Sequence, residues 1–160
     1  MKITGDLMYI IGVYVASPEG ITDRFFLLST DNRCNNEIRD RLKKAFKASK
    51  LEPEIKEDKE TGKVMYVFSR FSALAKEVGN IMPITKGVPI DLLTNCELQN
   101  SFMQGFFDRC ACDSRARHFS TKHIEIVYGI KALSTRMGYK VDVSTVTCGS
   151  YCAYNTSIML

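Results

Sequence analysis

A helix with a glycine at its centre occurs twice in this chain. Residues 5–16, GDLMYIIGVYVA, carry Gly12 among large apolar side chains, and residues 98–109, LQNSFMQGFFDR, carry Gly105 at the matched position. Glycine within a helix costs about 1 kcal/mol relative to alanine. Its recurrence at the same point of two apolar helices predicts that their backbones approach closely, with Gly12 and Gly105 at the contact.

The segments that follow the two helices have the same order in both halves of the chain. Each helix precedes an extended segment, then an amphipathic helix, then a strand pair with a turn at its centre. These segments are residues 21–32, 35–49 and 52–69 in the first half and residues 114–123, 124–138 and 140–158 in the second. The order predicts an internal duplication, in which two halves too small for separate cores pack on one another.

A break in the chain separates the two halves. A further helix is expected at residues 70–81, and the segment PITKGVP at residues 83–89 then ends the regular pattern with two prolines and a glycine. We therefore expect a domain boundary here. The predicted parts are a first repeat at residues 1–82, a linker at residues 83–91 and a second repeat at residues 92–160.

The composition is that of an ordinary folded protein with a small excess of positive charge. With 160 residues and 45% hydrophobic residues, the chain can bury a core. A net charge of +4 suits a polyanionic partner without requiring one. The sequence has no signal-peptide pattern and no apolar run long enough to span a bilayer, so we expect a cytoplasmic or otherwise intracellular protein without a membrane partner.

Six cysteines raise the questions of disulfides and of a metal site. Cys110 and Cys112, with Cys148 and Cys152, could supply four thiolates to zinc, but structural zinc sites usually have tighter spacings and turn glycines. Free cysteine is a common core residue. We therefore expect no metal bound by these thiols.

Two stretches resemble the motif of a known family. YIIGVYVASPEG, residues 9–20, and FMQGFFDRCA, residues 102–111, are similar to the motifs of the two-repeat, single-chain LAGLIDADG homing endonucleases. The second copy keeps Gly-aromatic-aromatic-Asp where the family has Gly-Leu-Ile-Asp. The resemblance covers nearly the whole chain. It implies an α+β fold with two pseudo-twofold-related halves, antiparallel saddle-shaped sheets, two central packed helices, and a monomer.

The resemblance also implies where a catalytic acid should stand. In the family each motif helix ends in an acid, five positions after the motif glycine, and the two acids hold divalent cations, usually magnesium, at the scissile phosphates. Ser17 and Cys110 occupy these positions here. A serine and a thiol are poor ligands for a hard cation. We therefore expect no catalytic residues of the family's kind and no cofactor, with Mg²⁺ relevant only if the protein is a nuclease after all.

Two nearby acids are the fallback ligands for such a nuclease. Glu19 lies two residues after Ser17, and Asp108 lies two residues before Cys110. A two-residue shift turns a helical side chain by roughly 200°, away from the axis that brings the pair together. Asp113 is a further candidate.

Basic side chains near the predicted sheets are the candidates for nucleic-acid contacts, because the family's sheets lie in the DNA major groove. Arg109 would place a cation near the helix ends, or would pair with Asp108, Asp113 or Glu97 instead. Neither His118 nor His123 has a paired acid at a spacing that indicates catalysis. The full set of candidates is Arg24, Lys56, Arg109, Arg115, Arg117, Lys122 and Lys140.

Four functions are compatible with these observations. The first is a catalytically degenerate LAGLIDADG-type protein that binds double-stranded DNA. The second is an active, site-specific homing endonuclease with relocated metal ligands. The third is an RNA-binding splicing maturase, since some family members act in this way, and the fourth is a protein-interaction scaffold. We favour the first, because phosphate neutralisation and groove contacts do not need the metal.

Overall fold

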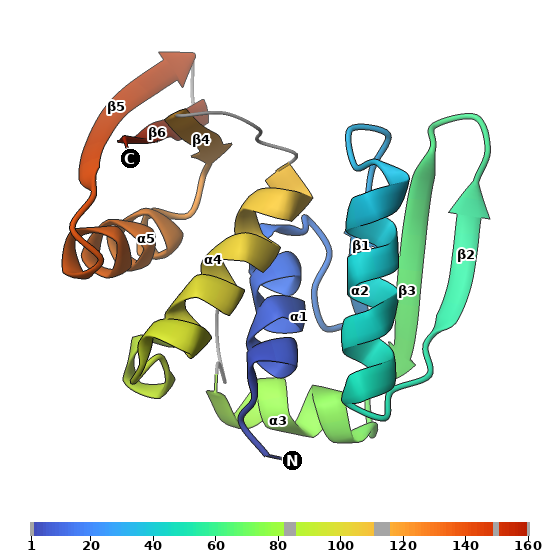
Figure 1. Ribbon diagram of the computed structural model, residues 1–160. Coiled ribbons are helices and arrows are strands. Elements are labelled where there is room, and N and C mark those ends of the chain that lie inside the picture. The colour runs from blue at the N-terminus through green and yellow to red at the C-terminus, as the bar shows by residue number, and fades with distance from the viewer. Residues whose placement is uncertain (1, 82–85, 111–115, 149–150, 160) are drawn as a thin grey trace.

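The computed structural model describes residues 2–81, 86–110, 116–148 and 151–159 of the chain. The fold is α+β, with two halves built in the same order around two central helices (Figure 1). The first half contains α1 (Gly5–Ala16), β1 (Phe25–Thr30), α2 (Asn36–Ala48), β2 (Glu54–Asp58), β3 (Lys63–Ser69) and α3 (Ala73–Ile81). The second half contains α4 (Cys96–Cys110), β4 (Ala116–Thr121), α5 (Ile124–Arg136), β5 (Lys140–Cys148) and β6 (Tyr151–Met159), preceded by the short 3₁₀ helix η1 (Ile90–Leu92).

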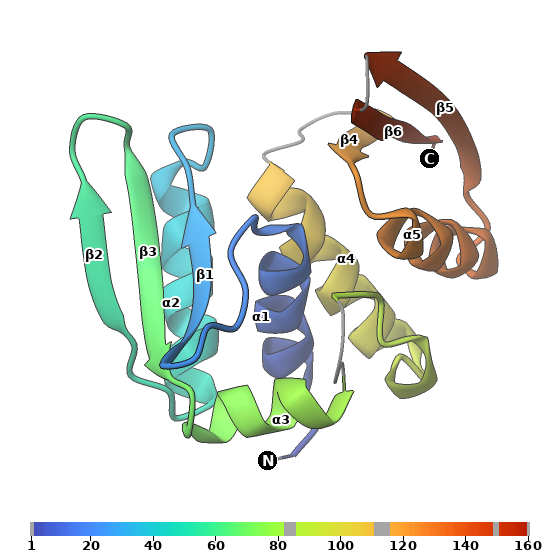
Figure 2. The same cartoon turned by 180° about the vertical axis from the view of Figure 1, so that it is seen from behind.

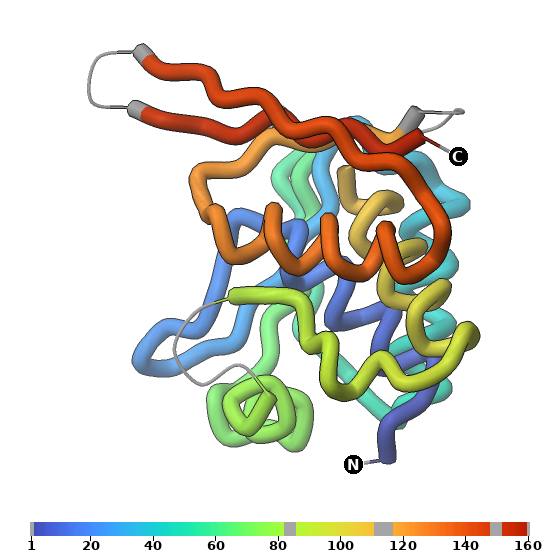
Figure 3. Tube along the Cα trace, turned by 90° about the vertical axis from the view of Figure 1, so that its left-hand side faces the viewer, coloured from blue at the N-terminus to red at the C-terminus, as the bar shows by residue number. Residues whose placement is uncertain are grey.

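The two sheets show the duplication in their strand order. The described strands are ordered β1-β3-β2 in the first sheet and β4-β6-β5 in the second, and all neighbours are antiparallel. In both halves the strand after the central helix therefore pairs with the last strand of the hairpin. Seen along another direction, the long β5–β6 hairpin runs along one edge of the molecule (Figure 3).

Helix α1 is central because it is apolar on every side. Its first turn is capped by Thr4, whose Oγ1 accepts a hydrogen bond from the backbone N–H of Leu7 at 3.2 Å. Every residue from Leu7 to Val15 is buried. A helix that is hydrophobic all round is stable only inside a protein, and α1 lies beside α4 and α2 between the two sheets (Figures 1 and 2).

The contact between α1 and α4 is made at the two motif glycines. A Cβ atom added at Gly12 would lie 2.2 Å from the carbonyl oxygen of Phe102, and one added at Gly105 would lie 2.1 Å from the carbonyl oxygen of Tyr9. Both neighbours are backbone atoms, which a rotamer change cannot move. The two helices touch backbone to backbone, and only glycine fits at either point.

The amphipathic helices cover one face of each sheet. In α2, which is capped by Asn35, Leu42 and Phe46 are buried, and the ring of Phe46 packs against those of Tyr66 and Phe68 on β3. In the second half, α5 buries its own apolar stripe against β4, β5 and β6. No helix in the described ranges is long and apolar enough to cross a membrane.

Candidate functional site

Both central helices end on the same side of the molecule. The C-terminal ends of α1 and α4 lie next to each other there, between the two sheets (Figures 1 and 2). Ser17 is the first residue after α1, and Cys110 is the last residue of α4. Equivalent positions of the two repeats thus meet at one place, which is where a site shared by both halves would form.

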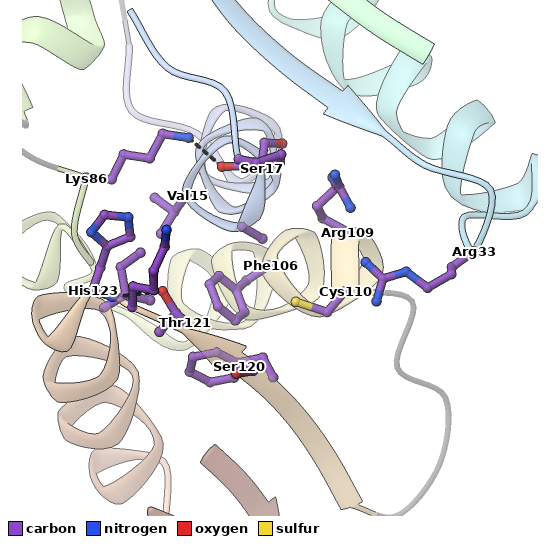
Figure 4. A pocket seen from close by; sticks show the side chains of 15 residues that line it. Val15, Ser17, Arg33, Lys86, Phe106, Arg109, Cys110, Ser120, Thr121 and His123 are labelled. Atoms are coloured by element: carbon purple, nitrogen blue, oxygen red, sulfur yellow. Dashed lines mark hydrogen bonds between the residues drawn. The ribbon is translucent and has the colours of Figure 1, made fainter. Parts of the chain in front are cut away.

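Ser17 is tied into the protein rather than offered to solvent. Its side chain is buried, with the hydroxyl donating to the carbonyl of Val13 at 2.7 Å and accepting the backbone N–H of Ser29 at 3.2 Å. The hydroxyl therefore closes the end of α1 and fixes β1 beside it. Cys110 is half-buried, and its Sγ faces the same space as Arg33 (Figure 4).

A lysine from the segment between the two halves covers the end of α1. The Nζ of Lys86 donates to the carbonyl oxygens of Tyr14 at 2.9 Å, of Ser17 at 2.6 Å and of Glu19, and it lies 4.2 Å from the centre of the Tyr14 ring. Burial lowers the pKa of Lys86 to about 8, so the ammonium form still dominates at pH 7. A fixed positive charge thus stands at the negative end of the α1 dipole.

Arg109, one of the predicted nucleic-acid contacts, is buried. Its side chain is only 5% exposed, and its guanidinium reaches Asp31 at 2.8 Å and the hydroxyl of Ser29 at 3.2 Å. Arg33 binds the same carboxylate at 2.7 Å. The ion pair is with Asp31, not with Asp108 or Glu97, which were the described partners considered from the sequence, because the turn after β1 brings Asp31 next to the end of α4. Asp113 lies outside the described residues. We therefore leave Arg109 out of the surface that could contact nucleic acid.

The fallback acid Asp108 points away from the helix ends. It accepts hydrogen bonds from the Tyr9 hydroxyl at 2.7 Å and from the Gln104 amide at 2.6 Å, and it forms a salt bridge with Arg41 of α2. Burial and the adjacent Asp108 carboxylate raise the pKa of Tyr9. Asp108 therefore joins α4 to α1 and α2.

The other fallback acid, Glu19, is also paired. It forms a salt bridge with Lys63 and accepts a hydrogen bond from the Ser29 hydroxyl at 2.6 Å. Although burial opposes ionisation, these two partners hold the pKa of the Glu19 carboxyl below its usual value. Glu19 therefore fixes the loop after α1 to the sheet.

A pocket of about 510 Å³ opens at the ends of the two central helices and is called the end pocket here. Its walls come from α1, the turn after β1, α4, β4 and the beginning of α5, so both halves contribute. Figure 4 shows Lys86 and His123 on one side and Arg33 with Cys110 on the other, around an apolar floor. The residues that define it are Val15, Ser17, Arg33, Lys86, Phe106, Arg109, Cys110, Phe119, Ser120, Thr121, Lys122, His123 and Ile126, with Ala16 and Pro18.

Comparison with solved structures identifies this architecture. The homing endonuclease I-DmoI, crystallised as mesophilic variants, matches with a TM-score of 0.66 at 12% identity, covering 98% of this chain and 89% of that one. The chain has the LAGLIDADG homing endonuclease fold. I-DmoI in complex with DNA and Ca matches with a TM-score of 0.67 at 14% identity over 98% of this chain and 83% of that one.

A third structure, I-DmoI in complex with DNA and Mn, has a TM-score of 0.65 at 12% identity, covering 96% of this chain and 89% of that one. No sequence model of a known protein family matches the chain, and no curated protein is detectably similar to it. The fold prediction made from the duplicated glycine helices is therefore confirmed by three-dimensional similarity.

The residues at the helix ends do not fit the divalent cation that the LAGLIDADG fold implies. Ser17 offers a hydroxyl already bonded to Val13 and has the ammonium of Lys86 at its carbonyl, and Cys110 offers a soft thiol. A hard cation needs carboxylate and carbonyl oxygens, and three carbonyls here are taken by Lys86. Within the described part of the chain, no group of three His, Cys, Asp or Glu residues is arranged to hold a metal ion. Cys112 and Asp113 lie outside the described residues.

The predicted basic contacts divide into two groups in the LAGLIDADG fold. Arg24, Lys56, Lys122 and Lys140 are exposed. Arg117 is half-buried, with its guanidinium 5.3 Å from the centre of the Phe107 ring. Its register opposite Ile158 places it on the helix-covered face of the second sheet, so it is less suited to a groove contact than the sequence suggested. Arg115 lies outside the described residues.

The outward face of the second sheet carries polar residues that the sequence reasoning missed. In the β4-β6-β5 register, Ser120, Asn155 and Ser144 stand side by side on the face opposite Phe119 and Thr156, and all three are exposed. His118 and Asp142 lie on the same face. The alternation of apolar and polar residues along β5 was the available signal. No comparable pattern marks Lys86 and Arg33, because both lie in irregular segments, and neither was predicted as a site residue.

Proposed function

We propose that this protein binds double-stranded DNA along the outward faces of its two sheets and does not cleave it by the metal-dependent, two-acid route. The observation that carries the proposal is the pair of helix ends, where the LAGLIDADG fold is retained while both positions expected to carry acids are uncharged. The proposed role is therefore recognition without cutting.

The surface chemistry supports binding to DNA. Arg24, Lys56, Lys122 and Lys140 are exposed and come from both halves, and such side chains neutralise phosphates. Asn155 with Ser120 and Ser144 gives the second sheet a row of short hydrogen-bonding side chains. Asparagine can bind adenine with two hydrogen bonds, and serine can bind several bases. The similar I-DmoI structures were crystallised with DNA, which adds to the case for a duplex partner.

The environment of the helix ends supports the absence of cleavage. Asp108 and Glu19 are the nearest alternative acids, and each is engaged by a cationic side chain, Arg41 and Lys63 respectively. Releasing either acid toward a metal would break its ion pair and its hydrogen bonds, from Tyr9 and Gln104 to Asp108 or from Ser29 to Glu19, which opposes metal binding. A relocated metal site therefore has no free carboxylate among the described residues at these helix ends.

Binding is tested by fluorescence anisotropy with labelled duplexes of random sequence in a series of salt concentrations. With four phosphate contacts, a fourfold rise in salt is expected to weaken binding about 150-fold. The variant R24A/K56A/K122A/K140A is expected to bind weakly and with a flatter salt dependence. Its control, K43A/K44A/K47A/K131A, removes the same charge from exposed positions on α2 and α5 and should bind as the wild type does.

The same samples separate this proposal from its alternatives. Tight binding that is insensitive to salt, or an equal loss in the control variant, would contradict the phosphate contacts. Magnesium-dependent nicking of a duplex library that disappears in D108N or E19Q would favour an active nuclease with relocated ligands. Competition by structured RNA at concentrations where duplex DNA does not compete would favour an RNA partner.

A further inference from the structure

The edges of the two sheets differ in how they are protected. The strand orders β1-β3-β2 and β4-β6-β5 leave β1, β2, β4 and β5 each with one side on which no described strand pairs. Such an edge presents unpaired N–H and C=O groups to any other strand, and proteins block it with charge, short length or a covering segment. Within the described ranges three of these edges are blocked, and the edge of β5 is not.

Each of the three blocked edges is blocked by different means. The segment before β1 folds back along it, so that the N–H of Leu27 donates to the carbonyl of Gly20 at 3.1 Å and the N–H of Thr22 donates to that of Phe25 at 2.8 Å. The six residues of β4 lie on the side of the central helices, where α4 packs against them (Figure 1). The five residues of β2 are all charged except Ile55.

Strand β5 has the same place in its sheet as β2 but the opposite character. It runs for nine residues and carries neither a charge after Asp142 nor a proline. The segment 143–147, VSTVT, is β-branched at every position except Ser144. Val143 and Val146 are 40% and 47% exposed. Uncharged β-branched runs of this kind are typical of strands that pair between chains.

The position of β5 leaves room for another strand. In Figures 1 and 2 it lies at the margin of the molecule far from the first half, and Figure 3 looks onto that margin from outside. Every residue from Asp142 to Thr147 is exposed. No described segment therefore covers this edge, and a strand from another molecule can hydrogen-bond to it.

A second copy of the same strand fits this edge. A strand that pairs antiparallel with its own copy has a twofold axis perpendicular to the sheet. An axis at Thr145 places Val143 opposite Thr147 of the second copy, and cross-strand pairs of β-branched side chains stabilise antiparallel sheets. Asp142 falls at the ends of the paired segment, so no charge is buried at its centre.

The other edges limit the assembly to two copies. Each chain offers one edge for pairing, and a twofold contact uses that edge in both copies. A single added strand buries less than about 1,200 Å², which is typical of weak complexes, and we expect a dissociation constant on the order of 100 µM. At lower concentrations the chain is then a monomer, as the family resemblance implies.

We propose that β5 is a self-association edge, along which two copies of this chain pair antiparallel about Thr145. The pairing joins two three-stranded sheets into one of six strands. It needs neither nucleic acid nor metal, so it is independent of the proposed function.

The experiment measures association of the protein without nucleic acid. In sedimentation equilibrium from about 5 µM to about 1 mM, the average mass should rise from that of one chain toward that of two. Hydrogen exchange, followed by NMR at both concentrations, reports the surface that pairs. Every second amide of β5 should exchange about fivefold more slowly at the higher concentration, because about four fifths of the chains are then paired. The amides of β2 should not change.

Variants at the axis test the pairing directly. T145K and T145E each place two like charges opposite one another and should weaken association at least tenfold. An equimolar mixture of the two should restore it, because lysine then faces glutamate. The matched control is I55K, which puts a lysine in place of an exposed β-branched residue on the edge of β2 and should associate as the wild type does. Since Thr145 is exposed, the variants should fold, and circular dichroism checks this.

The results separate pairing at β5 from other kinds of association. Loss in both single variants, recovery in their mixture and protection confined to β5 support the proposal. A mass of one chain throughout the range overturns it, as do association that T145K leaves intact and assemblies that grow beyond two copies. Failure of the mixture to recover overturns the pairing about Thr145. None of these outcomes bears on DNA binding, which is measured separately at concentrations where the chain is a monomer.

Discussion

The backbone contact between α1 and α4 leads to a sharp prediction for Gly12→Ala. The new methyl carbon would lie 2.2 Å from the Phe102 carbonyl oxygen and 2.8 Å from the Phe106 nitrogen. Carbon atoms in proteins pack at about 3.5 Å or more, so the helices must separate by about 1 Å. Overpacking of this kind costs about 3 kcal/mol, and the better helix propensity of alanine returns about 1 kcal/mol.

The net destabilisation is therefore about 2 kcal/mol, which lowers Tm by about 4–8 °C in a chain of this size. Gly79→Ala is the matched control, because Gly79 lies within α3 and a Cβ there would meet nothing within 4 Å. The same methyl group should raise Tm slightly at that position. Thermal unfolding followed by circular dichroism measures both.

A double variant makes the test stricter. Gly105→Ala places its methyl 2.1 Å from the Tyr9 carbonyl oxygen at the same helix crossing. Once either substitution has separated the helices, the second should cost little, so the two effects should be strongly non-additive. An unchanged or raised Tm in G12A, or simple additivity in G12A/G105A, would refute the argument that the two glycines serve one contact.

Three further predictions concern the helix ends. Lys86→Met should lower the free energy of unfolding, measured by urea denaturation, by about 1–3 kcal/mol, because three carbonyls lose their donor. Lys59→Met, at an exposed turn, is the control and should have little effect. Asp31→Asn should flatten the acid limb of stability. Although burial opposes ionisation, Arg33 and Arg109 hold the pKa of Asp31 well below its usual value. Its contribution is therefore fully present above that usual value and is lost progressively as the pH falls from about 5 through the usual value to the lowered pKa. A wild-type and D31N pair with equal slopes would contradict this. The Tm of the triple variant S17D/C110D/K86M should rise when Mn²⁺ is added, whereas the Tm of the wild type should not. Stabilisation of the wild type by Mn²⁺ would count against the proposed absence of a metal site.

Sequence periodicity was sufficient to predict the elements, and the resemblance of the two glycine helices to the LAGLIDADG motif predicted the fold. The helix expected at residues 5–16 is α1 (Gly5–Ala16), and the amphipathic helix expected at residues 35–49 is α2 (Asn36–Ala48). These signals are local, because burial of one stripe or one face leaves a repeating pattern in the chain. The paired glycines also predicted a contact between residues far apart in the chain. Because a glycine lowers the stability of a helix, its presence at the same position of two helices indicates that the two backbones pack closely there.

The site was predictable only in its position. The expectation that Ser17 and Cys110 stand at the two helix ends followed from the resemblance to the LAGLIDADG motif, and the structure places both residues in the lining of one pocket. The partners of the nearby charges did not follow from spacing. Arg109 pairs with Asp31, and Lys86 reaches the end of α1 from the other side of the chain's midpoint.

The sequence alone therefore determined the duplication, the order of elements and the glycine contact, because each is written in neighbouring residues or in a regular repeat. Only the tertiary structure decided the electrostatics of the helix ends. Charge interactions depend on distance and burial rather than on separation along the chain. For that reason Asp108 became a link between helices, Arg109 became a buried ion pair, and Lys86 became the cation at the end of α1.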